Sequence, residues 1–211
     1  KMNTAIILAA GQGTRMKSQT AKVLHKVGSK CLLQHVVDAA SDHVETINVI
    51  VGHNSQSVKG AIKESKINWV LQEKQLGTGH AVQQAAPFLN DDSTCLILYG
   101  DVPLIQSNTI EKLLVKAHKS GFSLLSVVLD DPSGYGRIIR DTNGLIQSIV
   151  EQKDASERQQ NVKEINTGIM AIKGSLLKKY LNELKPNNAQ GELYLTDIVE
   201  SAVKDNVNIA S

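Results

Sequence analysis

The chain has 211 residues, of which 41% are hydrophobic and 21% charged, and its formal net charge at pH 7 is +2. This length can bury a substantial core, and these proportions are typical of a globular protein. A charge so close to balance argues against binding to nucleic acid or to an anionic membrane, and an aromatic content of 3% leaves few side chains for stacking on bases.

The sequence shows no targeting or metal-binding signature of the common kinds. No apolar run approaches the length that crosses a membrane, and no charged and then apolar leader opens the chain, so we expect a cytoplasmic protein. Cys31 and Cys95 lie in apolar surroundings, which predicts reduced, buried thiols. The absence of C-x-x-C and H-E-x-x-H argues against zinc. We expect structural or surface roles for His53 and His80.

Strand-like and helix-like segments alternate in the first half of the chain. The predicted strands cover 5–8, 47–51, 69–71 and 95–99, and the predicted helices cover 32–40, 55–62 and 78–86. This β–α repetition predicts a mostly parallel sheet with helices on both faces. Ligands bind such sheets beyond the carboxyl ends of the strands, so the loops 9–15, 72–78 and 99–103 should converge on one crevice.

The second half is less regular. The predicted helices cover 109–119, 175–184 and 196–203, and the predicted strands cover 124–129, 136–140, 145–150, 165–172 and the beginning of one at 207–210. Thr142-Asn143-Gly144 predicts a hairpin turn. No repeat, low-complexity run or flexible linker separates the halves, so we predict one domain over 1–211 with a continuous sheet.

A glycine-rich loop follows the first strand. Gly11 and Gly13 bracket one residue, so the backbone can turn tightly and lie against a ligand. Backbone N–H groups in such a turn bind anions, and Arg15 and Lys22 add positive charge. We interpret this loop as a phosphate cradle, with a glycine-rich turn carrying two solvated cations as the alternative.

Spacing excludes two familiar cradles. The dinucleotide fingerprint G-x-G-x-x-G needs a third glycine where this chain has Met16, and an acidic residue where Gly52 and His53 follow the second strand. The P-loop needs four residues between its glycines and then Lys-Ser or Lys-Thr, and neither is present.

The cradle is the first part of a pattern that spans nearly the whole chain. Its segments are 8–16, 22–25, 72, 76–78, 98–103, 134–137, 149–151, 164–168 and 188–192. In this order they resemble the sugar-phosphate nucleotidylyltransferases, and specifically the N-terminal uridyltransferase half of the bacterial bifunctional N-acetylglucosamine-1-phosphate uridyltransferase/glucosamine-1-phosphate acetyltransferases. The resemblance implies a Rossmann-like nucleotide-diphospho-sugar transferase fold, α/β with a mostly parallel mixed sheet. It divides the chain into a nucleotide-binding half, 1–104, and a sugar-binding half, 105–211.

The reaction that the resemblance implies is Mg²⁺-dependent. UTP and N-acetylglucosamine 1-phosphate give UDP-N-acetylglucosamine and pyrophosphate, for bacterial peptidoglycan and lipopolysaccharide synthesis. The nucleophile is the phosphate of the sugar, already ionised at neutral pH, which fits the lack of a Ser-His-Asp or Cys-His constellation. Three alternatives stay open: another nucleoside triphosphate or sugar 1-phosphate, a nucleotide-binding regulatory domain without turnover, and a nicotinamide-dependent oxidoreductase, which the missing third glycine opposes.

The resemblance also implies a longer, homotrimeric parent protein. Its second half would be a glucosamine-1-phosphate acetyltransferase, a left-handed β-helix built from hexapeptide repeats, and no such repeats occur in these residues. We therefore expect that the 211 residues fold but turn over poorly compared with a version extended by a few tens of residues.

Three residues are the candidates for catalysis: Arg15, Lys22 and Asp101. Asp101 follows a hydrophobic strand, where a carboxylate can hold Mg²⁺ or simply cap a turn. The resemblance makes Asp101 the metal ligand, together with an asparagine beyond the last residue of this sequence. Arg15 and Lys22 should stabilise charge on the triphosphate. Ala21 stands where the family usually has proline, which should leave the lysine-bearing loop looser.

The remaining candidates bind the base, the nucleoside or the sugar. Gln72 alone would more often be an exposed polar residue, but its amide with the N–H of Gly77 can match the edge of uracil. The resemblance assigns Gln72, Gly77 and Thr78 to uracil, and Ala9, Ala10 and Gly11 to the nucleoside. It assigns the sugar side to Tyr99, Tyr135, Gly136, Glu151, Asn166, Tyr194 and Thr196. Further candidates for substrate binding are Leu8, Gly13 and Gly100.

Overall fold

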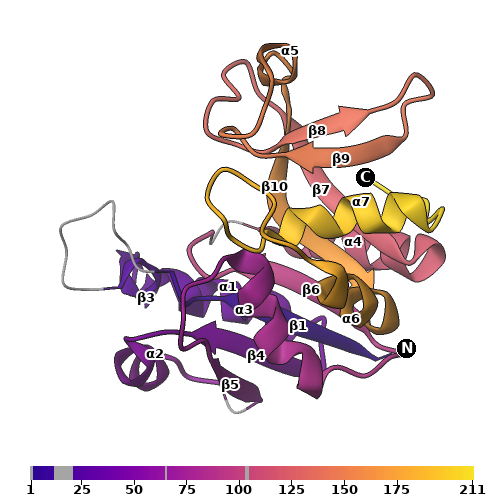
Figure 1. Ribbon diagram of the computed structural model, residues 1–211. Helices are drawn as coiled ribbons and strands as arrows, with labels where there is room; N and C mark the ends of the chain where they lie inside the picture. The colour runs from indigo at the N-terminus through magenta and orange to yellow at the C-terminus, as the bar shows by residue number, and fades with distance from the viewer. Residues whose placement is uncertain (1, 12–20, 65, 103–104) are drawn as a thin grey trace.

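The computed structural model describes residues 2–11, 21–64, 66–102 and 105–211. Its first half contains parallel strands in the spatial order β5-β4-β1-β6 (Figure 1). Their bounds are β1 (Asn3–Leu8), β4 (Thr46–Val51), β5 (Ile67–Leu71) and β6 (Thr94–Tyr99). The helices between them are α1 (Leu32–Ser41), α2 (Ser55–Ala61) and α3 (Thr78–Ala85), with the short turns η1 (Lys22–Leu24) and η2 (Ala86–Phe88). The predicted β–α repetition is confirmed.

The second half adds antiparallel strands to the same sheet. The strands are β7 (Phe122–Val128), β8 (Arg137–Arg140), β9 (Ile146–Val150) and β10 (Glu164–Lys173). The helices are α4 (Ser107–Ser120), α5 (Glu157–Gln160), α6 (Gly174–Glu183), η3 (Leu195–Asp197) and α7 (Ile198–Lys204). β10 pairs with β6, β7 and β8, and β8 with β9, so one eight-stranded mixed sheet joins strands of both halves, as predicted.

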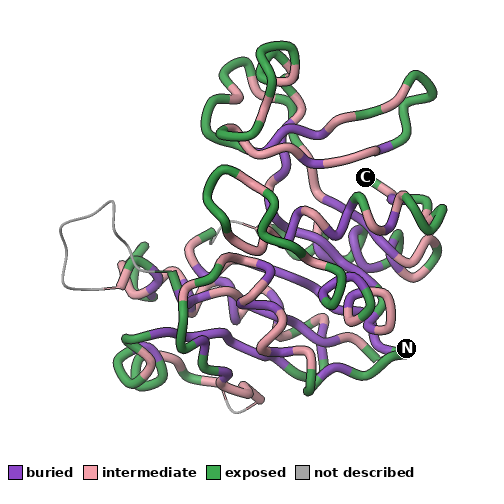
Figure 2. The backbone as a smooth tube through the Cα atoms, in the orientation of Figure 1, coloured by how far each residue is buried: buried purple, intermediate pink, exposed green. Residues whose placement is uncertain are grey.

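The two faces of the sheet carry separate hydrophobic clusters, because successive side chains of a strand point to opposite faces. Ile6 of β1 packs in the cluster that includes α3, α6 and α7, whereas Ala5 and Ile7 pack in the cluster that includes α1 and α4. Buried residues follow the central strands in Figure 2, and exposed ones the loops. Cys31 and Cys95 are both buried and free, as predicted. Burial raises the pKa of the Cys95 thiol to about 12, which keeps it protonated.

Local differences from the sequence prediction concern short elements. The hairpin of β2 (Lys26–Val27) and β3 (Lys30–Cys31) and the helix α5 are additional. The predicted helix 196–203 begins as the tight turn η3 and becomes α-helical only at Ile198. Instead of a strand at 207–210, the structure forms one bridge between Ala210 and Ser123. No helix in the described part of the chain is long and apolar enough to cross a membrane.

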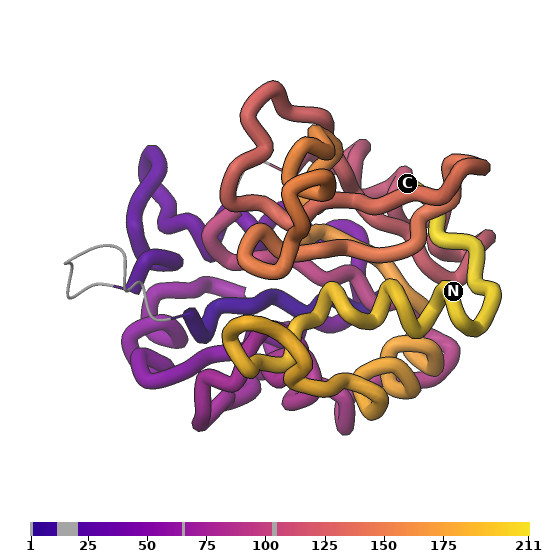
Figure 3. The backbone as a smooth tube through the Cα atoms, turned by 45° about the horizontal axis from the view of Figure 1, so that its top comes forward, coloured from indigo at the N-terminus to yellow at the C-terminus, as the bar shows by residue number. Residues whose placement is uncertain are grey.

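The topology places the ends of several strands at one edge of the sheet. Parallel strands bring the carboxyl ends of β1, β4, β5 and β6 together. Because β10 runs antiparallel to β6, with Met170 opposite Ile97, the amino-terminal part of β10 lies at this same edge. Helix α7 runs beside β9 and covers the second-half sheet (Figure 3). Loops from both halves of the chain therefore meet at one place.

Candidate functional site

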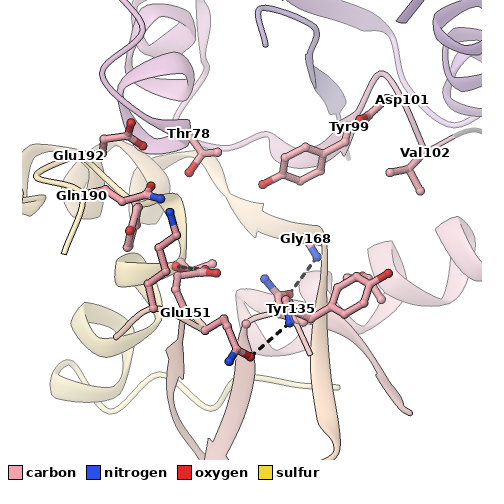
Figure 4. A pocket seen from close by; sticks show the side chains of 17 residues that line it. Thr78, Tyr99, Asp101, Val102, Tyr135, Glu151, Gly168, Gln190 and Glu192 are labelled. Atoms are coloured by element: carbon pink, nitrogen blue, oxygen red, sulfur yellow. Dashed lines mark hydrogen bonds between the residues drawn. The ribbon is translucent and has the colours of Figure 1, made fainter. Parts of the chain in front are cut away.

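A cavity of about 480 Å³ opens at this edge of the sheet. The predicted site residues that line it are Thr78, Tyr99, Asp101, Tyr135, Gly136, Glu151, Asn166, Tyr194 and Thr196. Figure 4 shows Tyr99 and Asp101 on one side of the cavity, Tyr135 and Glu151 across from them, and Thr78 near Glu192. The structure thus brings together residues that are more than 100 positions apart, such as Thr78 and Thr196.

Two of the predicted catalytic residues form an ion pair at the cavity. Lys22, at the start of η1, places Nζ 3.1 Å from Oδ2 of Asp101, which follows β6. The intervening Gly100 donates its N–H to the carbonyl of Leu8 at 2.9 Å, which fixes the end of β6 against β1. Both charged side chains remain partly exposed, so a ligand can reach them and replace their contact with each other. Arg15 and Gly13 lie outside the described residues.

Asp101 offers a single carboxylate as a metal ligand, which suits a site that is completed by other ligands. Within 2–11, 21–64, 66–102 and 105–211, no group of three or more His, Cys, Asp or Glu could hold a metal ion. Mg²⁺ is commonly held by one or two carboxylates, with substrate phosphates and waters completing its shell. The single carboxylate of Asp101 therefore fits a cation shared with a phosphate ligand and does not form a protein cage.

The predicted nucleoside contacts lie at the end of β1. Ala9 and Ala10 are buried, and the Ala9 N–H donates to the carbonyl of Ile50 at 2.8 Å. Gly11 is exposed, and a Cβ added there would meet nothing within 4 Å among the residues that the structure describes. Leu8 is half-buried, the last residue of β1. At this edge of the sheet these residues offer a ligand mainly backbone groups, because alanine and glycine have small side chains or none.

Gln72 is 2% exposed, so the interpretation as an exposed polar residue is wrong. Its backbone N–H donates to Val51 at 2.8 Å, directly after β5. Its side-chain Nε2 lies 3.3 Å from the carbonyl oxygen of Gly77 and 2.9 Å from Nδ1 of His80. His80 is thus a partner of a predicted base-binding residue, beyond the structural role that the sequence indicated.

The loop after Gln72 is fastened to the second half of the chain. Leu193 donates its N–H to Leu76 at 2.9 Å and accepts from the Gly79 N–H at 2.7 Å. Gly77 has φ +111°, and a Cβ there would lie 2.5 Å from the Leu193 carbonyl oxygen, so only glycine fits. Thr78 Oγ1 accepts from the N–H of Leu195 at 3.0 Å. This junction joins the predicted base loop to the segment that carries Tyr194 and Thr196.

Glu151 is an acidic residue of the cavity lining, on the side predicted to bind the sugar. Burial raises the pKa of its carboxyl, Asp154 adds to the rise, and the hydrogen bond from Thr196 opposes it. That bond joins Thr196 Oγ1 to Glu151 Oε1 at 3.2 Å. Gly136 packs against the same carboxylate, because a Cβ there would lie 3.2 Å from Glu151 Oε1. One oxygen of the Glu151 carboxylate, Oε1, therefore accepts from Thr196, and the other oxygen can accept a hydrogen bond from a ligand.

Asn166 and Tyr99 meet where β10 passes the end of β6. Asn166 Oδ1 accepts the Gly168 N–H at 3.1 Å, which leaves the Nδ2 hydrogens without a partner in the described part of the chain. Gly168 has φ +88°, and a Cβ there would lie 2.5 Å from Tyr99 Cε2, so the ring packs directly on the glycine backbone. Burial, with Glu151 and Asp101 nearby, raises the pKa of Tyr99, so its hydroxyl stays protonated.

Several lining residues are absent from the sequence-based candidates. They are Val102, Gly134, Gln152, Lys153, Thr167, Gly168, Gln190 and Glu192. Most of them are next to a predicted site residue or lie in a segment that carries the family resemblance. Closeness in the sequence to a predicted residue is therefore the signal that could have identified them. Gln75 is not among the residues that line the cavity, but its buried Nε2 has no hydrogen-bond partner among the described residues and lies 3.0 Å from where a Cβ on Gly52 would be.

Comparisons with known proteins agree with this architecture. Residues 5–158 match the MobA-like NTP transferase domain family. The chain is 50% identical over 205 residues to Bifunctional protein GlmU of Marinobacter nauticus, covering 97% of this chain and 45% of that protein. It is 52% identical over 207 residues to Bifunctional protein GlmU of Ruthia magnifica, covering 98% and 46%. The chain spans less than half the length of these curated relatives.

A solved structure confirms the fold class. The chain resembles the crystal structure of UDP-glucose pyrophosphorylase complexed with UDP-glucose, with a TM-score of 0.78 and 18% sequence identity. The match covers 97% of this chain and 88% of that one. At this identity the similarity concerns the fold alone, which is the predicted nucleotide-diphospho-sugar transferase fold. Since the family match extends over most of its residues, this chain belongs to the MobA-like NTP transferase domain family.

Proposed function

We propose that the chain is a uridyltransferase that makes UDP-N-acetylglucosamine and pyrophosphate from UTP and N-acetylglucosamine 1-phosphate. The observation that carries this proposal is the shared cavity, in which Asp101, the ion-pair partner of Lys22, and polar groups of the second half line one space. Identity of 50% and 52% to two proteins named Bifunctional protein GlmU supports the same assignment.

The nucleotide half handles the triphosphate and the base. Lys22 brings a fixed positive charge to the oxygens of the attacked phosphate, and Arg15 is proposed to do the same for the leaving pyrophosphate. Asp101 is the residue that would hold Mg²⁺, which when bound supplies neutralisation of phosphate charge. Gln72 and the N–H of Gly77 face the uracil, Thr78 contributes to this side, and Leu8, Ala9, Ala10, Gly11 and Gly13 line the nucleoside.

The sugar half orients the nucleophile. The attacking phosphate oxygen belongs to the sugar 1-phosphate, so these residues need only hold the sugar in line with the α-phosphate. Glu151 accepts from a sugar hydroxyl, and Asn166 donates its Nδ2 hydrogens to a hydroxyl or acetamido oxygen. Tyr135, Gly136, Tyr194 and Thr196 complete the sugar contacts proposed for this half. Tyr99, from the nucleotide half, is proposed to contact the sugar as well, and Gly100 beside it is proposed to bind substrate. We propose that the nucleotide-binding half, 1–104, and the sugar-binding half, 105–211, differ in function.

A longer protein of this kind would add the second activity. We propose that the acetyltransferase function and a homotrimeric state belong to such a protein and not to residues 1–211. The product would supply bacterial peptidoglycan and lipopolysaccharide synthesis.

A substrate panel tests the proposal. Pyrophosphate release is measured for UTP, CTP, ATP and GTP, each with N-acetylglucosamine 1-phosphate or glucose 1-phosphate, with and without Mg²⁺. The largest kcat/KM is expected for UTP with N-acetylglucosamine 1-phosphate in the presence of Mg²⁺. A preference for a different pair would replace the proposed substrates. UTP binding without pyrophosphate release from any pair, both in this chain and in a version extended by a few tens of residues, would indicate a regulatory domain.

A further inference from the structure

We propose that His80 is a positioning residue that selects UTP over CTP by fixing which atom of Gln72 faces the base. The proposal rests on the proposed function, in which Gln72 reads the base. His80 lies in the first turn of α3, and its ring nitrogen Nδ1 is 2.9 Å from Gln72 Nε2.

The contacts of Gln72 determine the orientation of its side-chain amide. The carbonyl oxygen of Gly77 can only accept a hydrogen bond, so the Gln72 atom that lies 3.3 Å from it is the nitrogen, Nε2. The same nitrogen lies 2.9 Å from His80 Nδ1, while the amide nitrogen of Gln84 lies 3.3 Å from the other ring nitrogen, Nε2. Only one nitrogen of a neutral imidazole accepts a hydrogen bond, and the shorter contact assigns that role to Nδ1, since the Gln84 nitrogen already donates to the backbone carbonyl of His80 at 2.9 Å. The amide nitrogen of Gln72 carries two hydrogens, and its contacts with Gly77 and His80 use both.

The other atom of the amide is left for a ligand. Gln72 Oε1 forms no hydrogen bond within the described part of the chain, although the residue is only 2% exposed. This oxygen can only accept, and so it favours a base edge that presents a donor. Position N3 of uracil carries a hydrogen and donates, whereas N3 of cytosine is itself an acceptor. Gln72 Oε1 can therefore accept a hydrogen bond from N3–H of uracil. With cytosine, the same oxygen would face N3, which is also an acceptor, and no hydrogen bond would form.

Gly77 alone cannot hold this orientation as firmly. Its contact with Gln72 is the longer of the two, at 3.3 Å, although Gly77 itself is well fixed against Leu193. Without an acceptor at the position of His80 Nδ1, the amide is free to turn and present its N–H₂ group to the base. A donor there would suit N3 of cytosine, so loss of His80 should relax the choice between the two pyrimidines.

The experiment compares His80→Leu, which removes the acceptor, with His80→Asn, whose Oδ1 can replace Nδ1. For each, kcat/KM is measured with UTP and with CTP at saturating N-acetylglucosamine 1-phosphate, and both nucleotides are titrated by calorimetry. We expect His80→Leu to lower the UTP/CTP ratio by about fivefold to tenfold, the equivalent of one buried hydrogen bond. His80→Asn should stay within about threefold of the unsubstituted chain. Gln83→Ala, also on α3 but bonded to the carbonyl of Leu181, is the matched control and should leave the ratio unchanged.

An unchanged ratio in folded His80→Leu, or equal losses in His80→Leu and His80→Asn, would overturn the proposal. Nitrogen-15 NMR of the unsubstituted chain at pH 8 gives a test that needs no variant: an unprotonated Nδ1 is expected, and a protonated Nδ1 would also overturn it. Absence of pyrophosphate release with every substrate would count against the proposed function, while the calorimetric UTP/CTP ratio would still decide the role of His80.

Discussion

The two sides of the cavity are built by different means. On the nucleotide side, loops follow parallel strands and present backbone groups, a lysine and an aspartate, each from a contiguous sequence motif. On the proposed sugar side, Glu151, Asn166 and Thr196 come from separate segments: the Thr196 side chain donates to that of Glu151, and Asn166 Oδ1 accepts from the backbone N–H of Gly168. In the proposed function, charge and backbone shape serve the phosphate chain, whereas buried polar side chains serve the sugar. The two sides should respond differently to substitution.

The largest loss of activity should come from a substitution on the nucleotide side. Asp101→Asn removes the charge that would hold the metal and that pairs with Lys22, while it keeps the shape. We expect turnover to fall by about 10²-fold or more, the scale for losing one electrostatic stabiliser of the transition state, with an unchanged circular dichroism spectrum. The exposed Asp92→Asn is the control. Near-normal Mg²⁺-dependent turnover in Asp101→Asn would remove Asp101 from the site.

The junction between the two sides can be broken sterically. In Gly77→Ala the Cβ would collide with the Leu193 carbonyl oxygen at a backbone φ of +111°. We expect a loss of stability of about 1–3 kcal/mol and higher KM values for both substrates, measured by urea unfolding and initial rates. Gly144→Ala is matched to it, because Gly144 also has a positive φ, +81°, but nothing within 4 Å. Equal losses in both variants would assign the effect to backbone strain and not to the junction.

Substitutions on the sugar side should separate the two substrates. Asn166→Ala and Glu151→Ala each remove a polar group from the cavity. Loss of one hydrogen bond costs about 1 kcal/mol, and more for a carboxylate, so KM for the sugar 1-phosphate should rise by about fivefold or more. Binding of UTP, measured by calorimetry, should change little. If UTP binding were lost while sugar binding stayed normal, the division into two sides would be wrong.

The smallest effect concerns pH. Burial first, and then Glu200, Glu151 and Asp154, raise the pKa of Asp197 to about 6. A carboxyl group with a raised pKa binds its proton more tightly in the folded chain, so stability falls as pH rises from about 4 to about 6 and stays reduced above that range. Asp197→Asn removes this cost.

The variant should therefore match the unsubstituted chain at about pH 4 and exceed it at pH 7. Because Asp197 is partly exposed, solvent screening limits the gain to about 1 kcal/mol, or roughly 2–4 °C in Tm for a chain of this size. Thermal melts at both pH values measure the difference. A gain of the same size at pH 4 would show that it does not arise from ionisation of Asp197.

The sequence by itself determined the elements whose signals are local. Apolar runs placed β1, β4 and β6 within a few residues, and Thr142-Asn143-Gly144 correctly predicted the turn between β8 and β9. These signals are local because a strand or a turn follows from the neighbouring residues alone. The helix α5, which the apolar pattern does not predict, has a local signal as well, because Ser156 and Gln159 form a capping box.

Only the tertiary structure decided what meets across the cavity. Insertion of β10 antiparallel to β6 sets Gly168 against the ring of Tyr99, and no local pattern gives that register. The burial of Gln72 and its bond to His80 depend in the same way on a junction with Leu193, which lies over 100 residues further along. The raised pKa values of Glu151 and Asp197 arise from desolvation, which the packed fold creates and a single sequence does not record.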